Sequence, residues 1–316
     1  MNAAHVITAQ GLSKRFGREA AVADLGFTVP PGTLLGLIGP SGCGKTTTVR
    51  LLTGVYRPSA GTATVLGQDP RHFTAATRRR IGYMPQTFVM YQDLSVWENL
   101  NFAASLYGQG LRRKERLREV LRFVELEGHR RKLARRISGG MQRRLALAAT
   151  LTHDPELIFL DEPTAGIDPI LRRKFWDYFK ALKEAGRTLF ITTQYVGEVV
   201  QCDWVGVMAD GRLLMVDTPD GLRRQFQGGD LIEIRTKSPH DEPTRSALRH
   251  LDFVIGQILP IHANALRVTV KDAGQAVPAL IDWARSRGFD ILAVEKYEAP
   301  MDDVFVQLIN QQKRNG

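Results

Sequence analysis

The sequence has little cysteine and no long apolar run, and each scarcity excludes a class of protein. Only two cysteines occur in 316 residues, Cys43 and Cys202. Neither belongs to a metal-type pair, so a disulfide framework and a cysteine-rich metal site are excluded. No segment approaches the roughly 18 consecutive apolar residues that cross a bilayer. Residues Met1–Gln10 lack a basic region followed by an apolar one, so we expect no secretion signal and a cytoplasmic protein.

Positive charge is abundant but unevenly distributed. The net charge is +10, and residues 112–136 alone contain eleven Lys or Arg against four Glu, a net of +7. Because the excess is concentrated in one helical segment, we expect no nucleic-acid partner. Two interpretations of that segment stay open. It is a solvated helix face with Glu–Arg pairs four residues apart, or a basic surface held near anionic lipid headgroups.

Short apolar strands alternate with helical patterns over residues 1–226, which is typical of an α/β core with a mostly parallel sheet. We expect buried strands at Leu34–Ile38, Glu156–Leu160 and Thr188–Thr192, because parallel strands are covered on both faces and form continuous apolar runs. Residues 88–150 interrupt the alternation, since two amphipathic helices follow one another with no strand between them. This pattern predicts a helical subdomain inserted in the core.

A second, smaller domain is predicted at residues 230–316. The stretch Gln227-Gly228-Gly229-Asp230 is typical of a linker. Beyond it, strands and helices follow in the order βαββαβ, and a last helix is expected from about Met301 to Gln311. That order is the one of the ferredoxin-like fold, so we expect a small α+β domain after the α/β core.

Residues 39–46 satisfy the phosphate-loop pattern Gly-x-x-x-x-Gly-Lys-Thr. Its glycines let backbone N–H groups turn toward phosphates, and the helix that follows adds partial positive charge at its start. We expect Lys45 to reach the terminal phosphates of ATP and the Thr46 hydroxyl to coordinate Mg²⁺. The expected nucleotide contacts of this loop are Gly39, Pro40, Ser41, Gly42, Cys43, Gly44, Lys45, Thr46 and Thr47.

An apolar run that ends in two acids, Leu157–Glu162, supplies the second half of the expected site. The end of a parallel strand lies beside the phosphate loop, so Asp161 is expected to hold Mg²⁺. Glu162 comes one residue later and is expected to polarise the attacking water as a general base. Taken alone, two acids after a strand are more often a turn or a helix cap, and the interpretation depends on the phosphate loop.

A third motif lies between these two halves. The stretch Ile137-Ser138-Gly139-Gly140-Met141-Gln142 resembles the signature motif of ATP-binding cassette (ABC) ATPases, whose usual form is Leu-Ser-Gly-Gly-Gln. From the residues alone, Ser138 caps a following helix whose first amides can bind an anion. The resemblance implies that Ser138, Gly139 and Gly140 contact the ATP that a second copy of the chain holds.

The resemblance to ABC ATPases covers residues 5–225 nearly continuously and assigns further roles. It implies that Phe16 stacks on adenine, that Gln86 senses Mg²⁺ and contacts a membrane partner, and that Asp168 crosses a dimer interface. The stretch Thr192-Thr193-Gln194-Tyr195 falls where the family usually has its switch histidine.

Three positions depart from the family pattern. Ile137 for leucine conserves volume, and Met141 replaces a glutamine that touches the partner's ribose, which we expect to matter little. Gln194 stands in place of the histidine that contacts the γ-phosphate, and it keeps an amide donor but carries no charge. We expect retuned or weakened hydrolysis, with Gln194 acting beside Glu162 and Lys45.

The family resemblance implies a complete machine. Two copies of the chain bind two ATP molecules with Mg²⁺ at the cytoplasmic face of the membrane, under separately encoded permease subunits that dock near residues 88–91. The tail, residues 299–305, is similar to the end of exporter ATPases of the drug and polysaccharide branch, so export is favoured. An importer ATPase with the same chemistry, a soluble ABC ATPase that acts on nucleic acid or ribosomes, and a small-molecule kinase are the alternatives.

Overall fold

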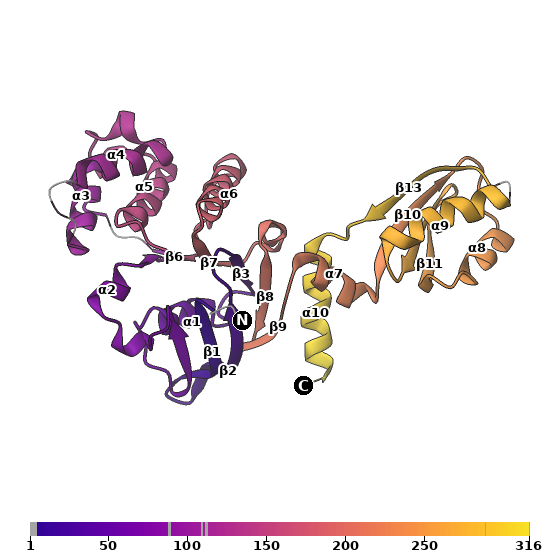
Figure 1. Ribbon diagram of the computed structural model, residues 1–316, viewed down its shortest axis with the longest axis horizontal. Coiled ribbons are helices and arrows are strands. Elements are labelled where there is room, and N and C mark those ends of the chain that lie inside the picture. Colours follow the sequence, from indigo (N-terminus) through magenta and orange to yellow (C-terminus); the bar gives the residue numbers. More distant parts are fainter. Residues whose placement is uncertain (1–4, 88–89, 109, 111–112, 288, 316) are drawn as a thin grey trace. The chain divides into compact units, whose positions relative to one another are not determined.

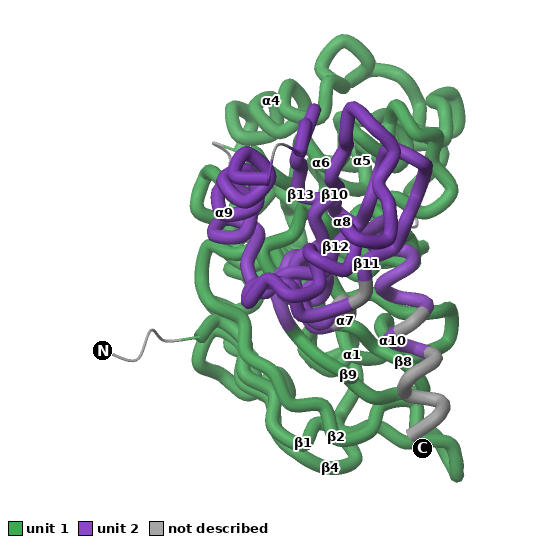
Figure 2. Tube along the Cα trace, turned by 90° about the vertical axis from the view of Figure 1, so that its right-hand side faces the viewer, with its two compact units in different colours: residues 1–216 green, residues 217–316 purple. Residues whose placement is uncertain are grey.

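The structure, a computed structural model, describes residues 5–87, 90–108, 110, 113–287 and 289–315. Two compact units make up the chain, Met1–Val216 and Asp217–Gly316, called unit 1 and unit 2 (Figure 2). The sequence predicted a boundary at residues 226–230, so the observed boundary lies earlier in the chain. The reason is a helix, α7 (Pro219–Gln227), which packs against the last helix of unit 2.

A six-stranded sheet forms the centre of unit 1, in the order β5-β6-β7-β3-β8-β9. The strands from β5 to β8 in that order run parallel. Every residue of β3, β6 and β7 is buried, which explains the continuous apolar runs of the sequence. The strands are β3 (Leu34–Ile38), β5 (Ile81–Met84), β6 (Leu157–Asp161), β7 (Thr188–Thr193), β8 (Trp204–Ala209) and β9 (Arg212–Asp217).

A second sheet of unit 1 is antiparallel, which the sequence did not predict. Its order is β2-β1-β4, built from β1 (Ile7–Phe16), β2 (Glu19–Val29) and β4 (Ala60–Val65). Buried and exposed residues alternate along β2, because one face of this sheet packs on the core while the other meets solvent. Gly17, with a φ of 59°, lies in the tight turn that joins β1 to β2.

Three helices of unit 1 stand together at one end of it, away from β1 and β2 (Figure 1). They are α3 (Val96–Leu106), α4 (Arg113–Phe123) and α5 (Gly139–Leu151), and they match the helical subdomain expected at residues 88–150. A capping box begins α3, in which Ser95 and Glu98 bond each other's backbone N–H groups.

The other helices of unit 1 are shorter or lie against the central sheet. They are α1 (Lys45–Leu52), α2 (Ala75–Arg78) and α6 (Pro169–Glu184). Phe175, Trp176 and Phe179 on α6 are buried in the core, so these aromatic side chains serve packing. Among the described residues, no helix is both long and apolar enough to cross a membrane.

Unit 2 contains the βαββαβ succession that the sequence predicts. Its four strands form one sheet in the order β11-β12-β10-β13, and each neighbouring pair is antiparallel. Gly228, in the left-handed conformation with a φ of 69°, ends α7, so the expected linker is a tight turn. The elements are β10 (Asp230–Thr236), α8 (Glu242–Arg249), β11 (Val254–His262), β12 (Ala265–Val270), α9 (Ala273–Ser286), β13 (Ile291–Tyr297) and α10 (Met301–Asn315).

Candidate functional site

The expected phosphate loop connects β3 to α1, at the edge where the parallel strands end. The backbone requires glycine at two of its positions. A Cβ on Gly39 would lie 2.2 Å from the carbonyl oxygen of Met208, and Gly44 has a φ of 104° as the N-cap of α1. Because no side chain caps α1, its first backbone N–H groups can donate to another acceptor, such as a phosphate oxygen.

The rest of the loop divides between an exposed tip and a buried base. Residues 40–42 form the tip, and Thr47 is half-buried on α1. Cys43 fills space beside Gly39, where a Cβ would lie 2.5 Å from its Sγ. Burial raises the pKa of the Cys43 thiol, which favours the neutral form that suits a packing role.

Lys45 bends back toward its own loop. Its Nζ donates hydrogen bonds to the carbonyl oxygens of Gly39, at 2.8 Å, and Pro40, at 3.0 Å. The same Nζ lies 3.6 Å from Oε1 of Glu162, and the lysine is only 4% exposed. The ammonium group is therefore held between the phosphate loop and the acid at the end of β6.

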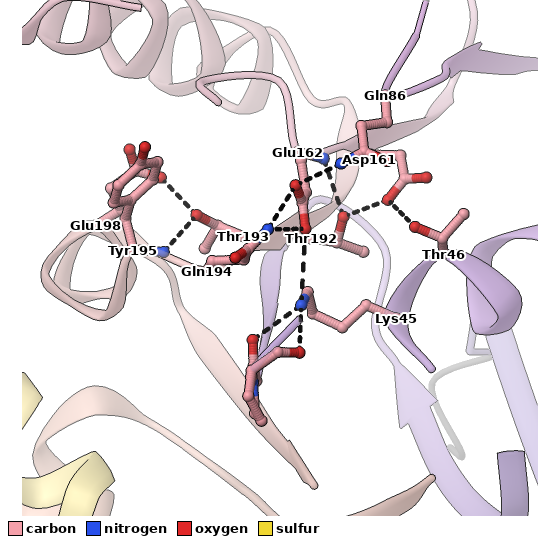
Figure 3. A network of polar contacts seen from close by, with 12 residues as sticks. Lys45, Thr46, Gln86, Asp161, Glu162, Thr192, Thr193, Gln194, Tyr195 and Glu198 are labelled. Carbon is pink, nitrogen blue, oxygen red and sulfur yellow. Dashed lines mark hydrogen bonds and ion pairs between the residues drawn. The ribbon is translucent and has the colours of Figure 1, made fainter. Parts of the chain in front are cut away.

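Asp161 is the last residue of β6 and is fully buried. Its Oδ1 accepts hydrogen bonds from the hydroxyls of Thr192, at 2.6 Å, and Thr46, at 3.1 Å (Figure 3). Its Oδ2 is buried and has no partner among the described residues. Burial raises the pKa of Asp161, and the bonds from Thr192 and Thr46 oppose that rise.

The oxygens of Thr46 and Asp161 fit a divalent cation of the magnesium type. Mg²⁺ takes hard oxygen ligands, and at phosphate sites it uses one or two protein groups together with phosphate oxygens and water. The orphaned Oδ2 of Asp161 is the observation that favours such an ion, because a buried carboxylate oxygen without a partner is costly. No cluster of three or more His, Cys, Asp or Glu side chains occurs among the described residues, so a site held by protein ligands alone is not seen there.

Glu162 directly follows β6 and has an unusual backbone. Its φ of 48° lies in the left-handed region, which is rare for a residue with a side chain and is often found at functional sites. Two amides hold its carboxylate: Nε2 of Gln86 lies 2.8 Å from Oε2, and Nε2 of Gln194 lies 2.8 and 2.9 Å from the two oxygens. Figure 3 shows Glu162 between Gln86, Gln194 and Lys45.

The amide of Gln194 is therefore directed at the expected general base. The sequence predicted that Gln194, in place of the family's histidine, acts beside Glu162 and Lys45. The contacts join Gln194 to Glu162, so this side chain belongs to the same polar network as Lys45.

Arg143 was missed by the sequence. Its guanidinium donates to three backbone carbonyl oxygens, those of Gln86 at 2.8 Å, Pro163 at 2.8 Å and Glu162 at 2.5 Å. It lies one turn into α5 and one helical turn before the buried Leu147. An arginine on the inward side of a helix requires carbonyl or carboxylate partners, and that position was the available signal.

Glu198 was also missed. It is 6% exposed, and its Oε2 accepts 2.9 Å hydrogen bonds from the hydroxyls of Thr164 and Thr193. Its Oε1 lies 3.3 Å from Nε of Arg172. Burial raises the pKa of Glu198, and the two threonines and the arginine oppose it. Glu198 therefore connects the segment after Glu162 with the end of β7. Figure 3 shows its bond to Thr193.

The signature-like residues lie elsewhere in unit 1. Ser138 is exposed and caps α5 by accepting from the N–H of Met141 at 3.3 Å. Asp168 is exposed and caps α6 in the same way. A Cβ on Gly140 would lie 2.7 Å from Leu171, so the starts of α5 and α6 are neighbours. Among the described residues, no hydrogen bond or ion pair joins Ser138–Gly140 or Asp168 to Lys45.

Phe16 lies at the end of β1 and is 46% exposed. Its ring meets Tyr56 edge to face, with 5.3 Å between ring centroids, and Tyr56 in turn accepts a hydrogen bond from Arg50 of α1. The ring is thus available to a flat ligand while it is linked to the helix that follows the phosphate loop.

The expected docking segment is described in part. Phe88 and Val89 lie outside the described residues, Met90 is buried, and Tyr91 is 53% exposed. Tyr91 borders a cavity of about 240 Å³ between α3 and α5. The other side chains on its wall are largely apolar and include Phe102, Leu106, Tyr107 and Leu145.

The chain is similar to known proteins along its whole length. The ABC transporter family model matches residues 22–165. The probable multidrug ABC transporter ATP-binding protein YbhF of Escherichia coli (strain K12) is 38% identical over 70% of this chain, which spans only 38% of YbhF. The daunorubicin resistance ATP-binding protein DrrA3 of Streptomyces coeruleorubidus is 35% identical over 98% of this chain and 97% of its own length.

Solved structures give the same result for the fold. An ATP-binding subunit of an ABC transporter matches 70% of this chain and 93% of its own, with a TM-score of 0.64 and 28% identity. The α/β core with its phosphate loop is thus the fold of an ABC cassette. With its phosphate loop, its Asp161–Glu162 pair and a full-length relative at 35% identity, the chain belongs to the ABC transporter family, as an ATP-binding protein.

Proposed function

We propose that this chain binds ATP with Mg²⁺ and hydrolyses it to power transport across a membrane. The observation that carries the proposal is the polar network in which the buried Glu162 is held by Gln86 and Gln194 beside Lys45. A general base needs a fixed position near the phosphate-binding groups, and this carboxylate has one.

The side chains divide the chemistry among them. The amides at the start of α1 and the ammonium of Lys45 bind the terminal phosphates and stabilise the charge that develops on them. Glu162 accepts the proton of the attacking water. Thr46 and Asp161 would hold the Mg²⁺, with Gln86 as a further expected contact, and the bound ion would neutralise phosphate charge. Phe16 stacks on the adenine ring.

We further propose that hydrolysis requires two copies of the chain. Ser138, Gly139 and Asp168 are exposed, and the starts of their helices are neighbours. Among the described residues, no hydrogen bond or ion pair joins them to the phosphate loop of their own chain. In a homodimer they complete the site of the partner, where the free amides at the start of α5 bind the far side of the ATP.

The transport partners proposed here are separate integral-membrane permease subunits, so the chain acts as a peripheral protein at the cytoplasmic face. The apolar cavity between α3 and α5 supports this, since a cavity with exposed Tyr91 and Leu106 suits an inserted helix of a partner. The relatives named for drug resistance, such as DrrA3, favour export over import.

Unit 2 is proposed to be a ferredoxin-like accessory domain. Its strand order β11-β12-β10-β13, with all neighbours antiparallel and two helices in a βαββαβ succession, supports that assignment. We infer a regulatory or dimer-stabilising role, because its sequence has no phosphate loop and no acid pair directly at the end of a strand.

Co-purification from detergent-solubilised membranes tests the transport role. We expect a polytopic membrane protein to accompany the tagged chain, and the variant Leu106→Glu to lose it because the charge enters the docking cavity. Val55→Glu is the matched control, since Val55 is similarly exposed but lies outside that cavity. A wild-type chain that is recovered alone, while it hydrolyses ATP at full rate, would contradict the proposed partnership and leave the ATPase intact.

A further inference from the structure

The basic segment of residues 113–136 contains two kinds of cation. Three arginines have a carboxylate oxygen within 4.0 Å. Arg116 pairs with Glu119 and Asp154, Arg122 pairs with Glu127, and Arg135 pairs with Asp93. Lys114, Arg118, Arg130, Arg131, Lys132 and Arg136 have no such partner among the described residues. The expected solvated face with Glu–Arg pairs therefore describes only part of the segment.

Four of the cations without a carboxylate partner line one cavity. Its volume is about 380 Å³, and its wall is formed by Ser95, Trp97, Glu98, Lys114, Arg118, Arg130 and Arg131. Two backbone hydrogen bonds fix its two sides to each other. The N–H of Trp97 donates to the carbonyl oxygen of Arg130, and the N–H of Val96 donates to the carbonyl oxygen of Lys132. The cavity is thus a built feature of the fold, and its size suits a phosphate-bearing group.

The one acid in this wall is already engaged. Oε2 of Glu98 accepts hydrogen bonds at 2.7 Å from both the N–H and the hydroxyl of Ser95. Those bonds lower the pKa of Glu98, so its carboxylate stays ionised. The carboxylate is thus already bonded as part of the cap of α3. Four cations against one carboxylate leave the cavity strongly positive, and such a cluster attracts phosphate.

Trp97 indicates which source of phosphate the cavity meets. Its indole is half-buried in the wall, and tryptophan beside Lys and Arg is typical of the boundary between headgroups and water. The same helix, α3, carries Leu106 in the proposed docking cavity, about 14 Å further along its axis. A helix that contacts a permease with one end brings its other end near the membrane surface.

We propose that the cavity of Lys114, Arg118, Arg130 and Arg131 binds the phosphate of an anionic lipid headgroup. The affinity for phosphate rests on the cavity alone, whereas the lipid as its source rests on the proposed permease partnership. Headgroup binding at this place holds the helical subdomain at the membrane independently of the permease contact.

Sedimentation of the full chain with vesicles tests this proposal without any permease. We expect binding to vesicles that contain phosphatidylglycerol and little binding to pure phosphatidylcholine. The double variant Arg118→Gln/Arg131→Gln should bind at least about tenfold more weakly, because both guanidinium groups line the cavity and would bond the headgroup phosphate directly. Lys132→Gln/Arg136→Gln, which removes the same charge from exposed positions of the same segment outside the cavity, should stay within about twofold.

Other outcomes would overturn the assignment. Equal losses in the two double variants would mean diffuse attraction with no site. Equal binding to both vesicle types would exclude an anionic headgroup. Binding of inorganic phosphate by the wild type without any vesicle binding would identify a soluble anion. Tighter binding to a DNA duplex than to vesicles would identify a nucleic-acid surface. ATP hydrolysis in solution should be unchanged in both double variants, which separates failure here from failure of the ATPase.

Discussion

Lys45, Asp161 and Glu162 are buried and joined in one polar network, whereas Ser138 and Asp168 are exposed and bond the first turns of the helices that they begin. Gln86, Gln194 and Lys45 all lie within 3.6 Å of the Glu162 carboxylate. Ser138 has only the first turn of α5 as a partner among the described residues. The contrast suggests that one half of the catalytic site is complete within a chain, while the other half is presented outward.

Removal of the general base from the buried half of the site should cause the largest loss of ATP turnover. Glu162→Gln keeps the shape of the side chain but cannot take a proton, so turnover should fall by about 10²–10⁴-fold while ATP binding persists. Phosphate release and nucleotide affinity measured side by side would check this. Turnover within threefold of the wild type would exclude Glu162 as the base.

Mixing two inactive variants probes the exposed half. Lys45→Ala destroys the buried half of a site, and Ser138→Arg blocks the exposed half with a bulky cation. A mixed dimer has one intact composite site, so an equimolar mixture should recover up to about a quarter of wild-type turnover. A mixture as inactive as each variant alone, together with a wild-type rate per chain independent of concentration down to nanomolar, would indicate a monomeric site.

Arg143 joins the two halves, since it lies on the helix that Ser138 begins and bonds the carbonyls of Gln86 and Glu162. Arg143→Ala leaves those carbonyls unpaired and should lower turnover by about 10–100-fold. Arg144→Ala is the control, because this neighbour bonds the carbonyl of Val124 and not the catalytic strand. Equal turnover in the two variants would remove Arg143 from the mechanism.

A smaller effect is expected at Gln194. Histidine there can carry charge and donate a stronger bond near the phosphate, so Gln194→His should keep turnover or raise it by up to about tenfold. Gln194→Ala removes the two contacts to Glu162 and should lower turnover, with ATP affinity nearly unchanged. If the glutamine, histidine and alanine forms turn over equally, Gln194 has no catalytic role.

The smallest effect should come from removing unit 2. A chain that ends at Val216 should hydrolyse ATP within about threefold of the full chain at high protein concentration, because every group of the network lies in unit 1. If the truncated chain needs a higher protein concentration to reach half of its maximal rate, unit 2 stabilises the dimer. A folded, ATP-binding truncation that cannot hydrolyse at any concentration would contradict an accessory role.

The sequence predicted best where a mechanism requires a fixed spacing. The loop from Gly39 to Thr46 and the acids after β6 follow from phosphate chemistry, and the structure places them side by side. The sequence predicted least where hydrogen bonds join segments that are distant in the chain. Arg143 and Glu198 bond partners that are up to 57 residues away in the chain, and only the packing of helices on the sheet brings these together.

The antiparallel sheet of β1, β2 and β4 was missed for a related reason. Alternation of buried and exposed residues was weaker there than the apolar runs of the parallel strands, so the parallel pattern was extended over it. In unit 2 the order of elements was predicted correctly, but α7 was assigned to the wrong side of the boundary. Its partner α10 lies at the far end of the sequence, where local pattern carries no information about it.

The left-handed backbone of Glu162 has a consequence for anyone who engineers this protein. A φ of 48° costs about 1 kcal/mol or more for a residue with a side chain, and glycine or asparagine adopts it more easily. A library screened only for melting temperature would therefore enrich replacements at this position. The variants with the highest melting temperature would be those that no longer hydrolyse ATP. Selection for thermal stability of this protein must therefore be coupled to a turnover assay.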